Sequence, residues 1–148
     1  MKKRIIFIFA ILAIFSGIIV VINAASSNGS SSEVQLLARA INGEARGEPY
    51  EGQVAVGAVI LNRVKDPSFP NTIAGVIYQS GAFTAVSDGQ INVPISENST
   101  VYKAAADAMN GWDPTGGCTY YFNPNTATNS WIWSKTIVKT IGKHNFCK

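Results

Sequence analysis

Charged residues and histidine are scarce in this sequence, and their scarcity limits the chemistry that it can carry out. Charged residues make up 14% of the 148 residues, and His144 is the single histidine. A mechanism or a metal site that needs two histidines is therefore excluded. The motifs G-x-x-x-x-G-K-[ST], G-x-G-x-x-G and H-E-x-x-H are also absent, so no motif supports nucleotide binding or zinc-protease activity. We expect no metal and no cofactor.

The excess of positive charge is confined to the N-terminus. The formal net charge is +3, and Lys2, Lys3 and Arg4 account for it, because the remaining basic residues equal the acidic residues in number. A group of basic residues between Lys135 and Lys148 is typical of a solvated face, with contact to an anionic polymer as the alternative. The isoelectric point of about 9.0 reflects the basic N-terminus, so it does not indicate nucleic-acid binding.

Residues 1–24 have the layout of an export signal. A basic stretch at residues 1–4 leads into the apolar run Ile5–Ile22, and small residues follow at positions 23–25. We expect cleavage after Ala24. The apolar run is long for a signal and nearly long enough to span a bilayer, so an uncleaved membrane anchor at residues 5–22 is the alternative. Both interpretations place the rest of the chain outside the cytoplasmic membrane.

The remaining sequence divides into a short linker and one folded domain. Residues 25–32 are rich in serine and typical of a flexible linker, and residues 33–148 are long enough to form one core. Patterning predicts helices at residues 33–43 (capped by Ser32), 51–64, 71–78 (capped by Asn71) and 99–110, irregular chain at 81–92, and strands at 118–122 and 137–141. The helix at 51–64 is apolar on every face, which indicates a central buried helix. Because helices precede strands, we expect an α+β fold with a short antiparallel sheet toward the C-terminus.

Two glutamates follow the first predicted helix. Glu44 stands at the junction with the highly apolar second helix, where we expect its carboxyl to be partly desolvated, as is typical of a general acid. Glu48 is a possible second carboxylate. Gly47 and Pro49 favour a chain break between the two glutamates, so Glu48 has an alternative role in the first turn of the second helix.

Aromatic residues gather around a polar loop in the C-terminal part of the sequence. Tyr120, Tyr121, Phe122, Trp131 and Trp133 flank the Asn- and Thr-rich stretch at residues 123–129. Aromatic rings that stack on the apolar faces of sugars, combined with amide and hydroxyl groups, make this region a predicted sugar-binding surface. Tyr120 and Phe122 share one strand face and are expected in the core.

The two cysteines have three possible states. Because the domain is predicted to be exported, a disulfide between Cys118 and Cys147 is the favoured expectation. Two free thiols are the first alternative. A zinc site with His144 is the second, although it would lack a fourth ligand. A Cys147–His144 nucleophilic pair is poorly placed at the chain terminus.

The domain resembles the SleB/CwlJ family of spore-cortex-lytic and cell-wall hydrolases, and within it the catalytic domains of the SleB members. The resemblance runs in order over nearly all of residues 33–148. It is carried by NGEARGEPYEGQVAV (42–56), LNRV (61–64), FPNT (69–72), GVIY (75–78), GAFTAV (81–86), NGWDPT (110–115), YYFNP (120–124), WIW (131–133) and GKHNFC (142–147).

This resemblance implies a lysozyme-like α+β domain that cleaves the glycan strand of peptidoglycan as a lytic transglycosylase, in spore cortex during germination. The first glutamate of E-A-R-G-E, Glu44, is then the catalytic residue. Candidate substrate contacts are Phe83, Thr84, Tyr121 and Trp133. The alternatives are a hydrolase of vegetative wall that uses Glu48 as second carboxylate, a non-catalytic peptidoglycan-binding module, and an enzyme that a regulatory partner protein controls.

Overall fold

A computed structural model of the chain describes residues 24–148. Its helices are α1 (Ala24–Ala45), α2 (Tyr50–Lys65), α3 (Ile73–Ile77), α4 (Thr84–Ser87) and α5 (Val101–Met109), with short 3₁₀ helices η1 (Gln90–Asn92) and η2 (Ser130–Ser134). Its strands are β1 (Tyr120–Phe122), β2 (Ile137–Ile141) and β3 (His144–Cys147). The predicted export segment, apart from Ala24, lies outside the described residues. Within residues 24–148, every helix is too short or too polar to cross a membrane.

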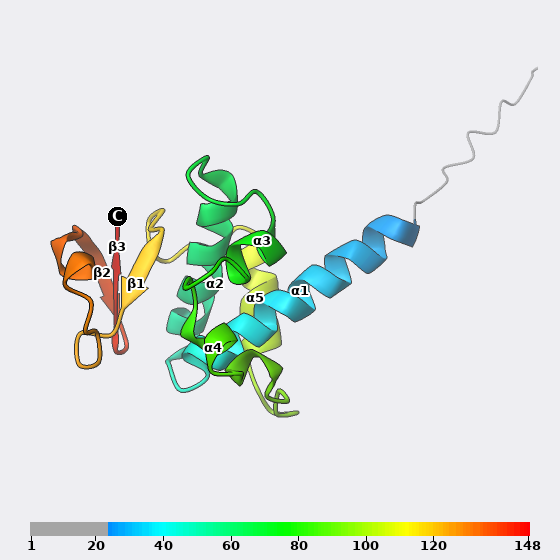
Figure 1. Cartoon of the computed structure of the whole chain (residues 1–148). Helices are drawn as coiled ribbons and strands as arrows, with labels where there is room; N and C mark the ends of the chain where they lie inside the picture. The colour runs from blue at the N-terminus through cyan, green and yellow to red at the C-terminus, as the bar shows by residue number, and fades with distance from the viewer. Residues whose placement is uncertain (1–23) are drawn as a thin grey trace, which may run out of the picture.

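Helix α2 forms the centre of the helical part, as its apolar sequence predicts. Every residue from Gly52 to Ile60 is buried. Helices α1 and α5 both pack against α2, and they contribute the buried side chains of Leu37, Ile41 and Val101 to the same core. Figure 1 shows α2 between the other helices and the sheet.

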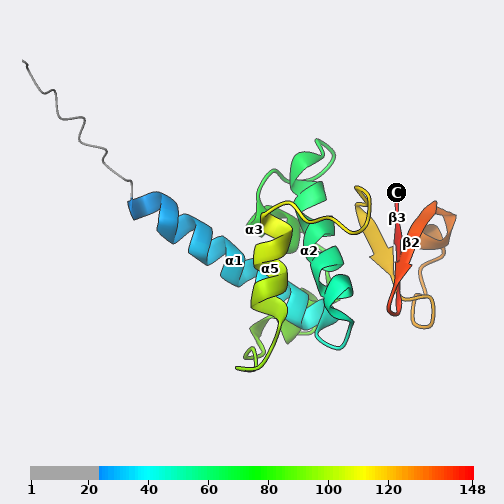
Figure 2. The same cartoon turned by 180° about the vertical axis from the view of Figure 1, so that it is seen from behind.

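The serine-rich stretch is helical, which corrects the expected linker and the expected cap at Ser32. Residues 25–32 all belong to helix α1 (Ala24–Ala45), and residues 30–33 are exposed on it. Once the packed part of a helix has formed, each added residue gains a backbone hydrogen bond without a new nucleation cost, so polar residues can extend it into solvent. Figures 1 and 2 show this end of α1 projecting away from the sheet.

Two further expectations for the middle of the chain were wrong in detail. The cap of α3 is Thr72, not Asn71, because the Thr72 hydroxyl accepts a hydrogen bond from the Gly75 N–H. Residues 81–92 are not irregular throughout, since they form α4 and η1. Helices of three or four residues are too short for a helical period to show in the sequence.

The C-terminal strands form one antiparallel sheet in the order β1-β3-β2. Figure 2 shows it at the opposite end of the molecule from the start of α1. Strand β3 was not predicted. It is short and begins with two polar residues, and it follows β2 through a turn in which Gly142 has a φ of +56°. Helices first and an antiparallel sheet last confirm the predicted α+β class.

Gly43 lets helix α4 lie directly against α1. A Cβ atom at position 43 would lie 2.6 Å from the Cβ of Ala85, well inside van der Waals contact. Ala85 is itself 2% exposed, so it has little room to move. The absence of a side chain at position 43 therefore fixes the distance between these two helices.

We predict that Gly43→Ala lowers the free energy of unfolding by about 1–3 kcal/mol, the usual cost of overpacking a core. Gly47→Ala is the matched control, because a Cβ at position 47 meets nothing within 4 Å. Chemical denaturation of both variants measures the difference. Equal stability of the two variants would contradict the packing argument.

Candidate active site

A cavity of about 620 Å³ lies between the helices and the sheet. Its walls come from the end of α1, α2, the segment before α4, strand β1, the loop after it, η2 and the start of β3. The lining residues are Glu44, Arg63, Phe69, Gln79, Ser80, Gly81, Ala82, Thr84, Tyr120, Tyr121, Phe122, Asn123, Thr126, Ala127, Thr128, Asn129, Trp131, Ile132 and His144. Amide and hydroxyl side chains are common among them, as the predicted sugar-binding surface requires.

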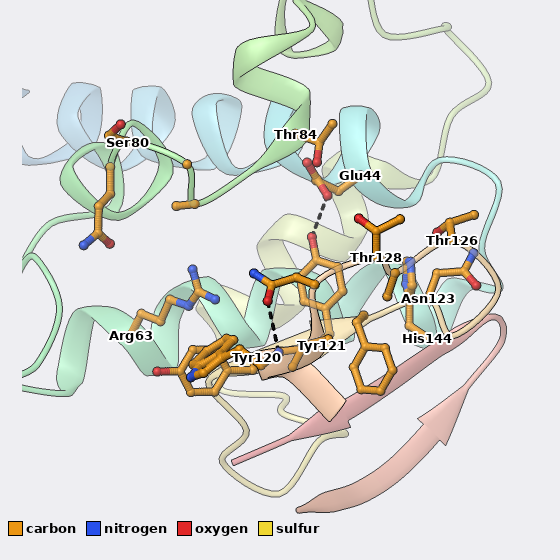
Figure 3. Close-up of a pocket in the computed structure, with 18 of the residues that line it drawn as sticks. Glu44, Arg63, Ser80, Thr84, Tyr120, Tyr121, Asn123, Thr126, Thr128 and His144 are labelled. Atoms are coloured by element: carbon orange, nitrogen blue, oxygen red, sulfur yellow. Dashed lines mark hydrogen bonds between the residues drawn. The ribbon is translucent and has the colours of Figure 1, made fainter. Parts of the chain in front are cut away.

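Glu44 lies in the last turn of α1 and is the one carboxylate among the residues that line this cavity. Its Oε1 accepts a hydrogen bond of 2.8 Å from the Ala85 N–H, and its Oε2 accepts one of 2.8 Å from the Tyr121 hydroxyl. The two donors come from α4 and β1, so elements far apart in the sequence hold one carboxyl group. Figure 3 shows Glu44 and Tyr121 pointing toward each other.

Tyr121 is a partner of the acid as well as part of the cavity wall. Its ring centroid lies 5.0 Å from that of His144 and 5.8 Å from that of Phe146. Burial, followed by the neighbouring charge of Glu44, raises the pKa of Tyr121 well above 10. The phenol therefore stays protonated and donates its hydrogen to Glu44. We had expected a substrate contact at this position, and the structure adds a direct bond to the carboxyl.

Arg63 lines the same cavity and forms no ion pair with a carboxylate of residues 24–148. It is 8% exposed, and its Nε donates a hydrogen bond of 2.7 Å to the Thr119 carbonyl oxygen. Burial lowers the pKa of Arg63 from its usual value. Sequence analysis gave this residue no role. Arg63 follows Val56 by seven residues and Ile60 by three, so it lies on the same buried face of α2. This spacing is the signal that could have predicted a buried arginine.

His144 forms another part of the wall, at the start of β3. It is 8% exposed, and its Nδ1 is buried without a hydrogen-bond partner among the described residues. Burial lowers the pKa of His144 below 6.5, and this effect outweighs the opposite influence of Glu48 and Glu44. The imidazole is therefore neutral near pH 7. Figure 3 shows it beside Asn123, on the side of the cavity away from Arg63.

The structure does not bring Glu48 to the cavity. Its Oε2 accepts a hydrogen bond of 2.9 Å from the Lys143 N–H in the turn between β2 and β3. Gly142 in that turn has no side chain, and a Cβ there would lie 2.0 Å from the same oxygen. Glu48 therefore holds the turn against the start of α2, and the structure does not place it in the cavity as a second carboxylate.

The remaining predicted substrate contacts have mixed outcomes. Thr84 lines the cavity. Phe83 is buried behind it, with its ring 5.1 Å from the guanidinium of Arg63. Trp133 lies outside the cavity, 51% exposed, and packs on Phe122, whereas Trp131 lines it. Residues two apart in a 3₁₀ helix point in different directions, so only one of these tryptophans can face the cavity.

Both cysteines are buried free thiols in this structure, so the expected disulfide is not formed. Cys118 belongs to the main core, whereas Cys147 packs with Phe122 and Ile132 in a separate cluster. Burial raises the pKa of both thiols. Residues 24–148 contain no group of three or more His, Cys, Asp or Glu side chains placed to hold a metal ion, so the alternative zinc site is not assembled there.

We predict that stability falls as the pH is lowered from 7.5 to 5.5. The unfolded chain binds a proton at its single histidine near pH 6.5, but buried His144 resists protonation, so the folded state loses stability below that pH. The slope cannot exceed about 1.4 kcal/mol per pH unit, the limit for one proton. Denaturant titrations measure it, and His144→Gln should flatten it. If stability depends on pH equally steeply in this variant, groups other than His144 cause the dependence.

Comparison with known proteins agrees with this geometry. The sequence model of the Cell Wall Hydrolase family matches residues 47–147. The chain is 61% identical to a spore cortex-lytic enzyme of Bacillus cereus over 80% of this chain and 45% of that protein. It is 58% identical to the spore cortex-lytic enzyme of Bacillus subtilis over 80% of this chain and 38% of that one. It is 30% identical to the cell wall hydrolase CwlJ of Bacillus subtilis, over 79% of this chain and 85% of that protein.

Solved structures give the same result. The catalytic domain of the Bacillus cereus SleB protein matches with a TM-score of 0.73 at 61% identity, covering 80% of this chain and 91% of that one. The catalytic domain of the germination-specific lytic transglycosylase SleB from Bacillus anthracis has the same TM-score and identity, covering 78% and 93%. The chain spans less than half the length of the spore cortex-lytic enzymes that it matches. It belongs to the Cell Wall Hydrolase family.

Proposed function

We propose that this domain cleaves the glycan strands of peptidoglycan as a lytic transglycosylase, with Glu44 as its single acid and base. The observation that carries this proposal is a cavity with one carboxylate, held by two donors and surrounded by amide, hydroxyl and aromatic side chains. The relatives named as spore cortex-lytic enzymes and as a germination-specific lytic transglycosylase support spore cortex as the substrate.

The proposed reaction needs no second carboxylate. Protonated Glu44 gives its proton to the glycosidic oxygen, the bond from that oxygen to C1 of muramic acid breaks, and an oxocarbenium-like centre forms at C1. The Glu44 carboxylate then takes the proton from the 6-hydroxyl of the same sugar, whose oxygen bonds to C1 and closes a 1,6-anhydro ring. Glu44 ends protonated, ready for another cycle. No water attacks, so the base of an inverting glycosidase or the nucleophile of a retaining one is unnecessary.

The surroundings of Glu44 suit both of its protonation states. A phenol hydroxyl can donate and accept hydrogen bonds, so Tyr121 stays bonded to Glu44 before and after proton transfer. The Ala85 N–H can only donate, and it stabilises the carboxylate that exists while C1 carries positive charge. Neutral His144 adds a polar wall without a competing charge.

We further propose that the domain acts outside the cytoplasmic membrane. The basic, apolar and small-residue layout of residues 1–25 supports export, by either a cleaved signal or a retained anchor. Residues 33–148 would then be the catalytic domain. Action on vegetative wall and control by a partner protein are the alternatives that the experiment below separates from cortex lysis.

We predict that Glu44→Gln lowers cleavage by about 10²–10⁴-fold, the usual contribution of a general acid or base. The control Glu48→Gln should keep most of the activity, because Glu48 holds a turn outside the cavity. Purified protein is incubated with spore-cortex and vegetative peptidoglycan, and soluble products are identified by mass spectrometry. Anhydro-muramic ends from wild type and Glu48→Gln, and none from Glu44→Gln, are the expected result.

Each other outcome has a defined meaning. Ordinary reducing ends would show attack by water and replace transglycosylation with hydrolysis. Full activity of Glu44→Gln would overturn the central assignment. Fragments from vegetative wall alone would remove cortex as the substrate. Binding without fragments from either wall would favour a binding module or a partner-dependent enzyme.

We also predict that Tyr121→Phe reduces turnover by about 10–100-fold. This variant keeps the ring packing against His144 and removes only the hydroxyl bonded to Glu44. A hydrogen bond to a charged group contributes about 1.5–3 kcal/mol, which corresponds to that range. Tyr102→Phe is the matched control, because Tyr102 is an exposed tyrosine on α5. Steady-state kinetics on soluble glycan strands measure the effect, and equal turnover of the two variants would contradict it.

A further inference from the structure

Arg63 is a buried cation that forms no ion pair among the described residues, and Glu44 acts on it only as a neighbouring charge. The ion pairs of the described residues are Lys103–Asp107 and Lys139–Glu51, and neither includes it. Charges that leave water are normally paired, because burial of an isolated ion is costly. A protein that uses this arginine only for packing would gain stability from an apolar side chain of similar size. The cation therefore indicates a ligand.

Three aromatic rings lie against the guanidinium. Its central carbon lies 5.1 Å from the ring centroids of Phe69 and Phe83 and 5.4 Å from that of Tyr120. Contact with ring faces compensates part of the lost hydration of a cation. The hydrogen bond from Nε to the Thr119 carbonyl then sets its rotation. The group is thus held in one orientation before any ligand arrives.

The free donors of Arg63 face the cavity. Nε is bonded to Thr119, and no described residue accepts a hydrogen bond from the two Nη atoms. Among the described residues, the only fully buried side-chain nitrogen or oxygen without a hydrogen-bond partner is Nδ1 of His144. Both Nη atoms of Arg63 are therefore partly exposed, and a ligand can reach them. Figure 3 shows the guanidinium end directed into the space below Ser80, to one side of Glu44.

We propose that Arg63 binds an acyl oxygen of the lactyl group on muramic acid, and so selects muramic acid over glucosamine beside Glu44. This proposal rests on the proposed function, since it identifies the substrate group that the same cavity recognises. The planar fork of N–H donors in arginine fits a planar acyl group, either a free carboxylate or an amide carbonyl. The two sugars differ at O3, where muramic acid carries the lactyl ether and glucosamine a hydroxyl. An arginine beside the catalytic acid is therefore suited to recognise that difference.

The test compares three variants on two substrates. Arg63→Met removes the charge and the fork, Arg63→Lys keeps the charge without the fork, and Arg46→Met is the matched control. Arg46 is exposed and bonded to Asn42 and Gln90 outside the cavity. The substrates are glycan strands with intact peptides and strands stripped of peptide by an amidase, which carry free lactyl carboxylates. Initial rates give kcat and KM, and N-acetylglucosamine oligomers serve as a binding probe without a lactyl group.

We expect Arg63→Met to lower kcat/KM by about 10²-fold on muramic substrates, with Arg63→Lys intermediate. Its affinity for N-acetylglucosamine oligomers and its melting temperature should remain close to those of wild type, and Arg46→Met should match wild type throughout. The wild-type preference between intact and stripped strands identifies amide or carboxylate as the bound group.

Two results would overturn the proposal. One is unchanged kcat/KM for Arg63→Met. The other is a loss that is equal for muramic and glucosamine ligands and parallels a fall in melting temperature, which would mark Arg63 as structural. If Arg63→Met does not fold, the same comparisons with Arg63→Lys decide the question. If wild type cleaves neither substrate, the proposed function fails, and the affinities for a muramyl disaccharide and an N-acetylglucosamine dimer still test Arg63.

Discussion

The hydrogen bonds that converge on the Glu44 carboxyl determine how the helices and the sheet must meet. One bond comes from the backbone of α4 and the other from the side chain of Tyr121 in β1. For both to form, α4 must lie against the end of α1, which Gly43 permits, and β1 must lie across the cavity from it. A carboxyl that enters a partly desolvated site needs such donors, because an unpaired buried charge is strongly unfavourable. The position of the acid is therefore a property of the whole fold and not of α1 alone.

The sheet is held in place by contacts that lie outside the reaction itself. Glu48 accepts a hydrogen bond from the turn between β2 and β3, and Arg63 donates one to the chain just before β1. Phe146 in β3 is fully buried in the main core and stacks on Tyr121. These contacts tie both edges of the sheet to α2 and to the segment before it. The E-A-R-G-E sequence thus supplies the proposed acid through its first glutamate and an anchor for the sheet through its second.

Sequence reasoning succeeded where one residue pattern dominates and failed where the outcome depends on three-dimensional context. The apolar run of α2 and the junction position of Glu44 were predictable because burial is visible along the chain, and strand β2 because its residues are β-branched. The choice between Trp131 and Trp133 was not, since it depends on the rotation of a single 3₁₀ turn. A disulfide was predicted because export favours one in general, whereas the structure buries both cysteines as free thiols, and this burial is a tertiary property. Arg63 was overlooked because a single arginine in an apolar helix carries no motif.

The cavity combines a cation and an acid side chain from the helices with neutral groups from the sheet. Glu44 enters from α1 and Arg63 from α2, while Tyr121 and His144 remain neutral because burial disfavours their charged forms. No other acidic residue, lysine or arginine is among the residues that line the cavity, so no further charge weakens the action of these two on a ligand. In the proposed reaction, a neutral sugar ring with one acyl substituent would suit that distribution, with its glycosidic oxygen at Glu44 and its acyl oxygen at Arg63. The uncharged wall matters as much as these two groups, because an additional carboxylate in the cavity would pair with Arg63 and occupy the donors that the proposal assigns to the substrate.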